Sequence, residues 1–123
     1  MAKILIADDE QDILDLLVFT LRFAGHEVMA ANNGEEALRL TQTEKPELVL
    51  LDVRMPRMNG LETCRKIKAD PALRHIPILF VSAWGQESEI KSGLDAGAVG
   101  YVVKPFEPNQ IILKVAELVA HRA

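Results

Sequence analysis

Short apolar runs alternate with segments of helical periodicity five times along the chain, and this alternation constrains the fold more than any other feature of the sequence. The runs are rich in Val, Ile and Leu, and most are continuously apolar, as in parallel strands that are buried on both faces. Five such units predict a doubly wound α/β fold, in which helices cover both faces of a five-stranded parallel sheet. The predicted strands are Lys3–Ala7, Glu27–Ala31, Leu48–Leu51, Ile78–Val81 and Tyr101–Val103.

The segments between the strands carry helix signals of their own. Gly25 suits the position just past a helix C-terminus, and Pro108 suits the first turn of the last helix. The apolar residues of that last segment recur with the spacing of one helix face. We expect helices over about residues 10–24, 33–45, 60–70, 87–97 and from 107 onward.

Length and composition limit the functions that need to be considered. The 123 residues suit one domain, expected over residues 1–123. Hydrophobic residues make up 49% and charged residues 26% of the chain, which excludes a disordered polypeptide. The net charge is −4 and no basic cluster offsets it, so no direct binding of nucleic acid is expected.

Cysteine content and hydropathy indicate the compartment. Cys64 is the single cysteine, which excludes an internal disulfide and suits a reducing environment. No apolar stretch approaches the ~20 residues needed to span a bilayer, and the N-terminal apolar run is too short for a signal peptide. We therefore expect a cytoplasmic location and no membrane contact.

Polar residues follow four of the five predicted strands. The first strand runs into Asp8 and Asp9, the third into Asp52, the fourth into Ser82 and the fifth into Lys104. In an open parallel sheet all the strand C-termini lie along one edge, where ligands bind. The sequence therefore predicts that these side chains meet at one site.

The residue types at this edge suit phosphoryl transfer. Three carboxylates repel each other unless a cation relieves the repulsion, and Mg²⁺ favours carboxylates together with a phosphate. Lys104 is a suitable partner for a phosphate, and the Ser82 hydroxyl can donate to a phosphoryl oxygen. A carboxylate nucleophile would give an aspartyl phosphate, in a reaction that the protein aids by positioning and charge neutralisation.

Five motifs, in this order, resemble the receiver domain of two-component response regulators. They are Asp8-Asp9, LVLLD ending at Asp52, MPRMNG at 55–60, FVSA around Ser82 and YVVKPF at 101–106. The resemblance covers essentially the whole chain. It implies a flavodoxin-like three-layer sandwich with strand order 2-1-3-4-5.

The resemblance also implies a role for each acidic residue. Asp52 would be the phosphoacceptor. Asp9 and Asp52 would bind Mg²⁺ directly together with the backbone carbonyl of Arg54, and Asp8 would act mainly through a bound water. The chain would then be a switch that catalyses only its own phosphorylation and dephosphorylation, and not a classical enzyme.

The same resemblance implies how phosphorylation is sensed. Ser82 and Lys104 would bind the phosphoryl oxygens, while Ser82 and Tyr101 would move as the switch pair of a two-state element. The peptide bond between Lys104 and Pro105 would be cis, as only X-Pro bonds commonly are.

Partners follow from the same family. The phosphodonor would be the phosphohistidine of a sensor histidine kinase or a histidine phosphotransfer protein. The output face would be formed by the fourth helix, fifth strand and fifth helix, acting on a downstream effector protein or a fused output domain. Val99, Gly100 and Gln110 depart from the pattern of the DNA-binding branch, which weakens that alternative, and a phosphorylation-dependent homodimer stays open.

The first predicted helix has more apolar residues than one face requires. Leu14, Val18 and Phe19 remain once a core stripe has been assigned. We interpret Leu14 and Val18 as a docking patch for the phosphodonor, because exposed apolar clusters usually mark partners. In the alternative, the helix is rotated and these residues are core. The stripe assigned to the core is Ile13, Leu16, Leu17, Leu21 and Ala24.

Two large residues flank the predicted site. Arg54 lies two residues past Asp52, and Trp84 lies two residues past Ser82. We hypothesise that they partly cover the site and slow hydrolysis of the phosphate; the alternative is that both point to solvent.

Two other functions compete with a working receiver. An acid-nucleophile phosphatase usually has a second acid two residues after its nucleophile, where this chain has Arg54. A degenerate receiver could serve only as a binding module, but the complete set of acidic residues, serine and lysine argues against it.

Overall fold

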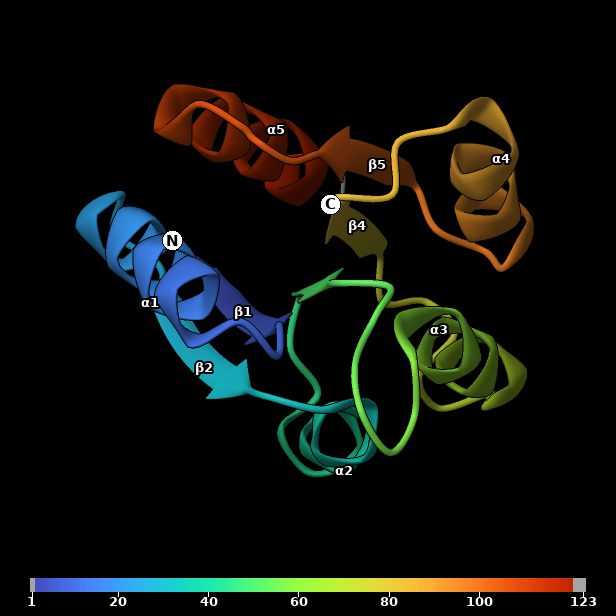
Figure 1. The fold of residues 1–123 in the computed structure, drawn as a ribbon. Helices are drawn as coiled ribbons and strands as arrows, with labels where there is room; N and C mark the ends of the chain where they lie inside the picture. Colours follow the sequence, from blue (N-terminus) through green and yellow to red (C-terminus); the bar gives the residue numbers. More distant parts are fainter. Residues whose placement is uncertain (1, 121–123) are drawn as a thin grey trace.

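Figure 1 shows a computed structural model of the chain, which describes residues 2–120. Strands and helices alternate throughout this part, as the sequence predicts. The strands are β1 (Lys3–Ala7), β2 (Glu27–Ala31), β3 (Leu48–Leu51), β4 (Ile78–Ser82) and β5 (Gly100–Val103). The helices are α1 (Gln11–Phe23), α2 (Gly34–Glu44), α3 (Gly60–Ala69), α4 (Glu87–Asp95) and α5 (Pro108–Ala120).

The strands form one parallel sheet in the order β2-β1-β3-β4-β5, which confirms the predicted topology. The register pairs Ala7 with Leu51 and Ser82 with Val103. β1 and β3 therefore end level with each other, as do β4 and β5, whereas β4 runs two residues past the end of β3, because Leu51 pairs with Phe80. This alignment carries the residues that follow β1, β3 and β5 to the same edge of the sheet.

Two apolar cores lie on opposite faces of the sheet because successive strand side chains point to opposite sides. In β1, Ile4 and Ile6 face α1 and α5, whereas Leu5 and Ala7 face α2 and α3. Figure 1 shows this division, with α1 and α5 on one side of the sheet and α2, α3 and α4 on the other. Cys64 is fully buried in the second core, as expected for a small packing residue.

Helix α1 faces the sheet differently from the sequence prediction. Leu14, at 4% exposed, is buried together with Leu17 and Leu21, at the i, i+3, i+7 spacing of one helix face. Val18 is half-buried against the same core, whereas Leu16 is 40% exposed. The interpretation of Leu14 as an exposed docking residue is therefore wrong, because the helix face that carries Leu14 packs against the sheet.

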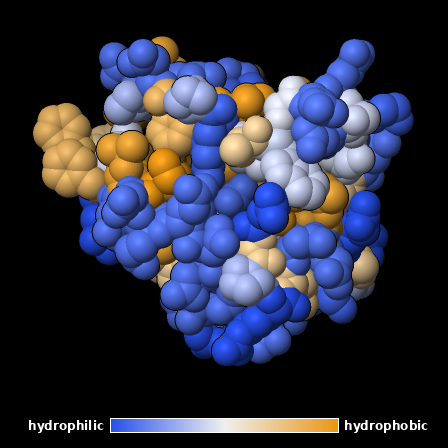
Figure 2. Space-filling view, in the orientation of Figure 1, coloured by the Kyte–Doolittle hydropathy of each residue, from blue (hydrophilic) through white to orange (hydrophobic). Residues whose placement is uncertain are grey.

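A second apolar stripe of α1 lies on its solvent side. Phe19 and Phe23 are strongly exposed, and their rings stack with centroids 6.3 Å apart. Figure 2 shows apolar side chains projecting from the side of the molecule that α1 occupies in Figure 1. Together with Leu16, these side chains leave α1 apolar on two sides.

None of the helices in residues 2–120 combines the length and apolar content that a membrane crossing requires.

Candidate functional site

The polar residues that follow the strands are held at the sheet edge by one further backbone hydrogen bond each. The Asp8 N–H donates to the last carbonyl of β2 (3.1 Å), and the Asp52 N–H donates to the last carbonyl of β1 (3.0 Å). The Lys104 N–H donates to the carbonyl of Ser82 (2.9 Å). The ladder therefore continues one residue beyond β1, β3 and β5 and fixes the backbone positions from which these side chains extend.

Lys104 is a shared counter-charge for three carboxylates. Its Nζ donates to Asp8 Oδ2 at 2.8 Å, to Glu10 Oε1 at 3.2 Å and to Asp52 Oδ2 at 3.4 Å. The Lys104 side chain is only 8% exposed. The peptide bond between Lys104 and Pro105 is cis, which confirms that prediction.

The second oxygen of each buried carboxylate is held by the backbone. Asp8 Oδ1 accepts the Glu10 N–H at 2.9 Å, and Asp52 Oδ1 accepts the Val53 N–H at 2.8 Å. Each carboxylate is thereby fixed in orientation, and its Oδ2 points toward Lys104. Carboxylate oxygens that are already held in one orientation suit a reaction that depends on the positioning of the reacting groups.

Burial and charge oppose each other in this group. Burial raises the pKa of the Asp8 carboxyl, and the Asp52 charge adds to this, against the lowering effect of its hydrogen bonds from Lys104 and the Glu10 N–H. Burial by itself would lower the pKa of the Lys104 ammonium, but its contacts with Asp8, Asp52 and Glu10 outweigh burial and raise that pKa. Lys104 is therefore positively charged at neutral pH.

Gly60 lets the loop after β3 close tightly behind Asp52. A Cβ at this position would lie 2.1 Å from the Asp52 carbonyl oxygen. The Gly60 N–H donates to the Val53 carbonyl at 2.8 Å, and Asn59 caps α3 by accepting the Glu62 N–H. Only glycine allows this approach, so the Asn-Gly pair of the sequence motif has a direct structural reason.

Ser82 and Tyr101 both contact the loop that follows β4. The buried Ser82 Oγ accepts the Trp84 N–H at 3.2 Å, and the Tyr101 hydroxyl donates to the Trp84 carbonyl. The Tyr101 ring packs on Phe80 with centroids 5.8 Å apart. The two predicted switch residues therefore share one partner, the backbone of Trp84.

Arg54 and Trp84 meet over the site. The Arg54 guanidinium lies 5.7 Å from the centroid of the Trp84 ring, in the geometry of a cation–π contact. Both side chains line a hollow of about 370 Å³ that contains Asp52 and Ser82, and both line a neighbouring hollow of about 580 Å³. The structure thus places them at the walls of the site, as the covering hypothesis requires, and their effect on hydrolysis stays a prediction.

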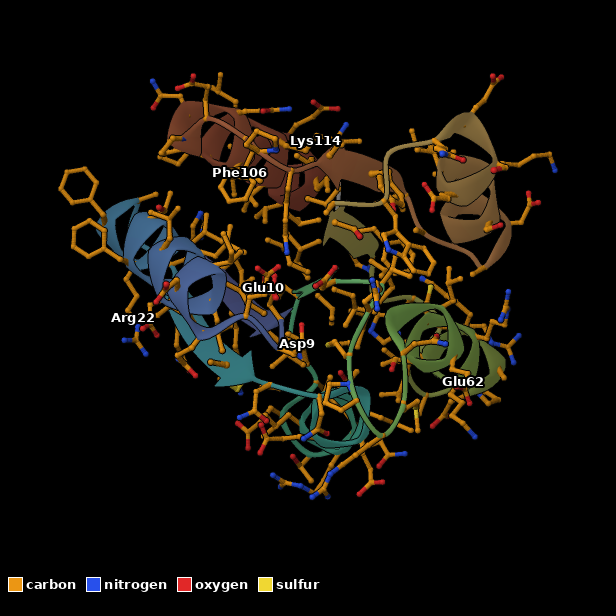
Figure 3. All side chains as sticks on the ribbon, in the orientation of Figure 1. Asp9, Glu10, Arg22, Glu62, Phe106 and Lys114 are labelled. Atoms are coloured by element: carbon orange, nitrogen blue, oxygen red, sulfur yellow. The ribbon has the colours of Figure 1, made fainter. Side chains whose placement is uncertain are left out.

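Asp9 lines both hollows but is exposed. Within residues 2–120, the carboxylates that gather within 4.8 Å of one another are instead those of Asp8, Asp52 and Glu10. Figure 3 shows Asp9 and Glu10 near each other at the start of α1. Sequence reasoning missed Glu10, although its position directly after the Asp8-Asp9 pair was a usable signal.

The donor set suits a divalent cation. The three clustered carboxylates share the ammonium of Lys104. The hollow beside them is lined by a further acid, Asp9, and by the cation Arg54, so negative charge remains in excess. Carboxylate and carbonyl oxygens are the ligands that Mg²⁺ prefers. The residues present therefore fit a magnesium ion.

Fold and site together define a receiver domain, and residues 4–116 match the family model of the response regulator receiver domain. The chain belongs to this family, whose members are signalling domains of two-component systems and not classical enzymes.

Among curated proteins, the chain is 40% identical over 113 residues to the alkaline phosphatase synthesis transcriptional regulatory protein PhoP of Bacillus subtilis, covering 92% of this chain and 46% of PhoP. It is 37% identical over 112 residues to the phosphate regulon transcriptional regulatory protein PhoB of Pseudomonas aeruginosa, covering 91% of this chain and 49% of PhoB. The chain thus spans about half the length of these relatives.

Among solved structures, a putative response regulator from Chloroflexus aurantiacus superimposes with a TM-score of 0.92 and 35% identity, covering 97% of this chain and 98% of that one.

Proposed function

We propose that this chain is a phosphorylation switch in which Asp52 accepts a phosphoryl group, in a Mg²⁺-dependent step, from the phosphohistidine of a sensor histidine kinase or a histidine phosphotransfer protein. The observation that carries the proposal is the Asp52 carboxylate. It is buried at the sheet edge, lines an open hollow and has a lysine ammonium 3.4 Å away.

The two carboxylate oxygens of Asp52 have different roles in this proposal. Oδ1 is held by the Val53 N–H, which leaves Oδ2 as the attacking atom. A bond forms between Oδ2 and phosphorus as the bond between phosphorus and the donor imidazole nitrogen breaks, and that nitrogen keeps the electron pair. Asp9, Asp52 and the Arg54 carbonyl would hold Mg²⁺, which neutralises charge on the phosphoryl oxygens when it is bound.

Lys104 and Ser82 would receive the new phosphoryl oxygens. Lys104 already lies beside Asp52 Oδ2. The Ser82 hydroxyl would turn toward the phosphate and give up its contact with the Trp84 N–H. Because the Tyr101 hydroxyl also bonds to the Trp84 carbonyl, a shift of the loop after β4 would release Tyr101. Addition of one phosphoryl group would then switch Ser82 and Tyr101 between two alternative conformations.

The output would run through the face formed by α4, β5 and α5. Exposed apolar side chains on and beside these elements support this choice; they are Leu94, Val99, Val103 and Leu113. The partner would be a downstream effector protein or a fused output domain, or a second copy after phosphorylation. We further propose that residues 1–123 act as one receiver domain in the cytoplasm, without direct contact with nucleic acid.

The test is intact mass after incubation with acetyl phosphate, with and without Mg²⁺. One Mg²⁺-dependent phosphate that is labile to alkali and absent in Asp52→Asn is the expected result. Failure to bind Mg²⁺ together with no adduct would favour the binding-module alternative. Multiple turnover on a phosphomonoester would favour the phosphatase.

A further inference from the structure

Glu10 occupies the N-cap position of α1, where a side-chain oxygen ordinarily accepts a hydrogen bond from the first helical turn. The Glu10 side chain makes no capping bond. Its Oε1 instead accepts a hydrogen bond from Lys104 Nζ at 3.2 Å, across 94 positions of sequence. The Glu10 carbonyl still accepts the Leu14 N–H at the start of the helix, so it is the side chain that bonds to the site in place of the helix end.

The three partners of Lys104 differ in what phosphorylation would do to them. Asp52 would become an acyl phosphate and lose its carboxylate charge, and Asp8 would also interact with the bound cation through a water. Glu10 is not among the residues proposed to accept the phosphoryl group or to hold Mg²⁺, and its side chain is 61% exposed at the rim of the site. It is therefore a partner that Lys104 can keep throughout the reaction.

We propose that Glu10 is a positioning residue that holds the Lys104 ammonium beside Asp52 while the phosphoryl group is received; this inference rests on the proposed function. Lysine is a point charge on a flexible stem, and ordering such a side chain costs conformational entropy. With Glu10 in place, the Lys104 side chain is already partly ordered before the phosphoryl group binds, so binding loses less conformational entropy. Without it, Lys104 keeps its contact with Asp8 but loses one of the contacts that order it, and the phosphoryl group must supply more of that ordering.

The first test is titration with beryllofluoride, a mimic of the phosphoryl group, at saturating Mg²⁺. Trp84 is the single tryptophan and lines the site, so its fluorescence reports binding. Glu10→Ala is expected to weaken binding about fivefold, the equivalent of ~1 kcal/mol. Glu10→Gln keeps an oxygen that accepts the Lys104 bond and is expected to stay within about twofold of wild type.

Asp12→Ala is the matched control. Asp12 is an exposed acid in the first turn of α1, so this variant removes a negative charge from the same helix end without touching Lys104. It is expected to bind beryllofluoride as wild type does. Equal weakening in Glu10→Ala and Asp12→Ala would overturn the inference, as would equal weakening in Glu10→Ala and Glu10→Gln, which would indicate net charge and not a hydrogen bond.

The second test needs neither metal nor mimic. Metal-free protein is acetylated briefly with acetic anhydride, and the extent at each lysine is read by mass spectrometry against exposed Lys91 as an internal reference. Lys104 is expected to react several-fold faster in Glu10→Ala than in wild type, because its ammonium has lost a partner. Unchanged labelling of Lys104 would overturn the inference.

The two tests separate the inference from the function on which it rests. Wild-type protein that shows no Mg²⁺-dependent response to beryllofluoride would refute the proposed function. Wild-type protein that responds, beside a Glu10→Ala variant that responds equally well, would refute only the role of Glu10.

Discussion

Leucine truncation on α1 tests which side of this helix is core. Leu14 is 4% exposed and packs against the sheet, whereas Leu16 on the same helix is 40% exposed. Leu14→Ala and Leu16→Ala remove the same atoms and change helix propensity equally. Any difference between them therefore reports burial.

The expected magnitudes follow from these environments. Leu14→Ala should lower the free energy of unfolding by about 3 kcal/mol, within the usual range for buried leucine. Leu16→Ala should cost less than about 1 kcal/mol, since a partly exposed side chain loses little contact with the core. At ~2.1 cal/mol/K of unfolding entropy per residue, the Leu14→Ala loss corresponds to a fall in Tm of roughly 12 °C for a chain of this length.

Urea unfolding followed by circular dichroism measures both variants, with Tm from a thermal scan as a second reading. Equal losses in the two variants, or a larger loss for Leu16→Ala, would refute the assignment of the Leu14 face to the core. Phosphorylation by acetyl phosphate provides a control that the fold around Asp52 is intact in Leu16→Ala.

Three other predictions concern the site itself. Burial raises the pKa of the Asp8 carboxyl above its ordinary value, so the ionised carboxylate lowers the stability of the fold at pH values above that raised pKa. Asp8→Asn should therefore raise Tm at pH 7 in EDTA. The increase in Tm should shrink as the pH falls toward the ordinary pKa of an Asp carboxyl, because Asp8 of the wild type then becomes protonated. A Tm for Asp8→Asn at or below that of wild type at pH 7 would contradict this. Gly60→Ala places a Cβ 2.1 Å from the Asp52 carbonyl oxygen and should cost about 1–3 kcal/mol in urea unfolding, while also slowing modification of Asp52; an unaffected midpoint would show that the loop relaxes freely. Arg54→Ala or Trp84→Ala should shorten the aspartyl-phosphate lifetime about two- to fivefold, the rate equivalent of a cation–π contact of ~0.5–1 kcal/mol, and an unchanged decay of the phosphorylated mass would refute the covering role.

The order of helices and strands was predictable because it depends on local patterns. Apolar runs of strand length and the Gly and Pro residues between them placed all five strands to within a residue or two of their ends. The same pattern placed Asp8, Asp52 and Lys104 directly after strands. Since parallel strands share one C-terminal edge, the meeting of these residues at one site was predictable from the sequence, whereas the distances of 2.8 Å and 3.4 Å from Lys104 to Asp8 and Asp52 are set by the folded sheet.

The facing of α1 was not predictable from its own residues. The helix carries two apolar stripes of similar strength, one with Leu14 and Leu17 and one with Leu16 and Phe19. Helical periodicity reports that a stripe exists, but the choice between two stripes depends on the shape of the sheet and of α5, which belong to distant parts of the chain.

The contacts of Glu10 and of the pair Arg54 and Trp84 have the same origin. Glu10 reads as an ordinary acid at a helix start, and its partner Lys104 lies 94 positions away. Arg54 and Trp84 sit in two separate loops, and only the packing of β3 beside β4 brings them together. Spacing within one segment encodes its secondary structure and its strand-end chemistry, whereas contacts between segments arise only when the folded sheet sets the distance between them.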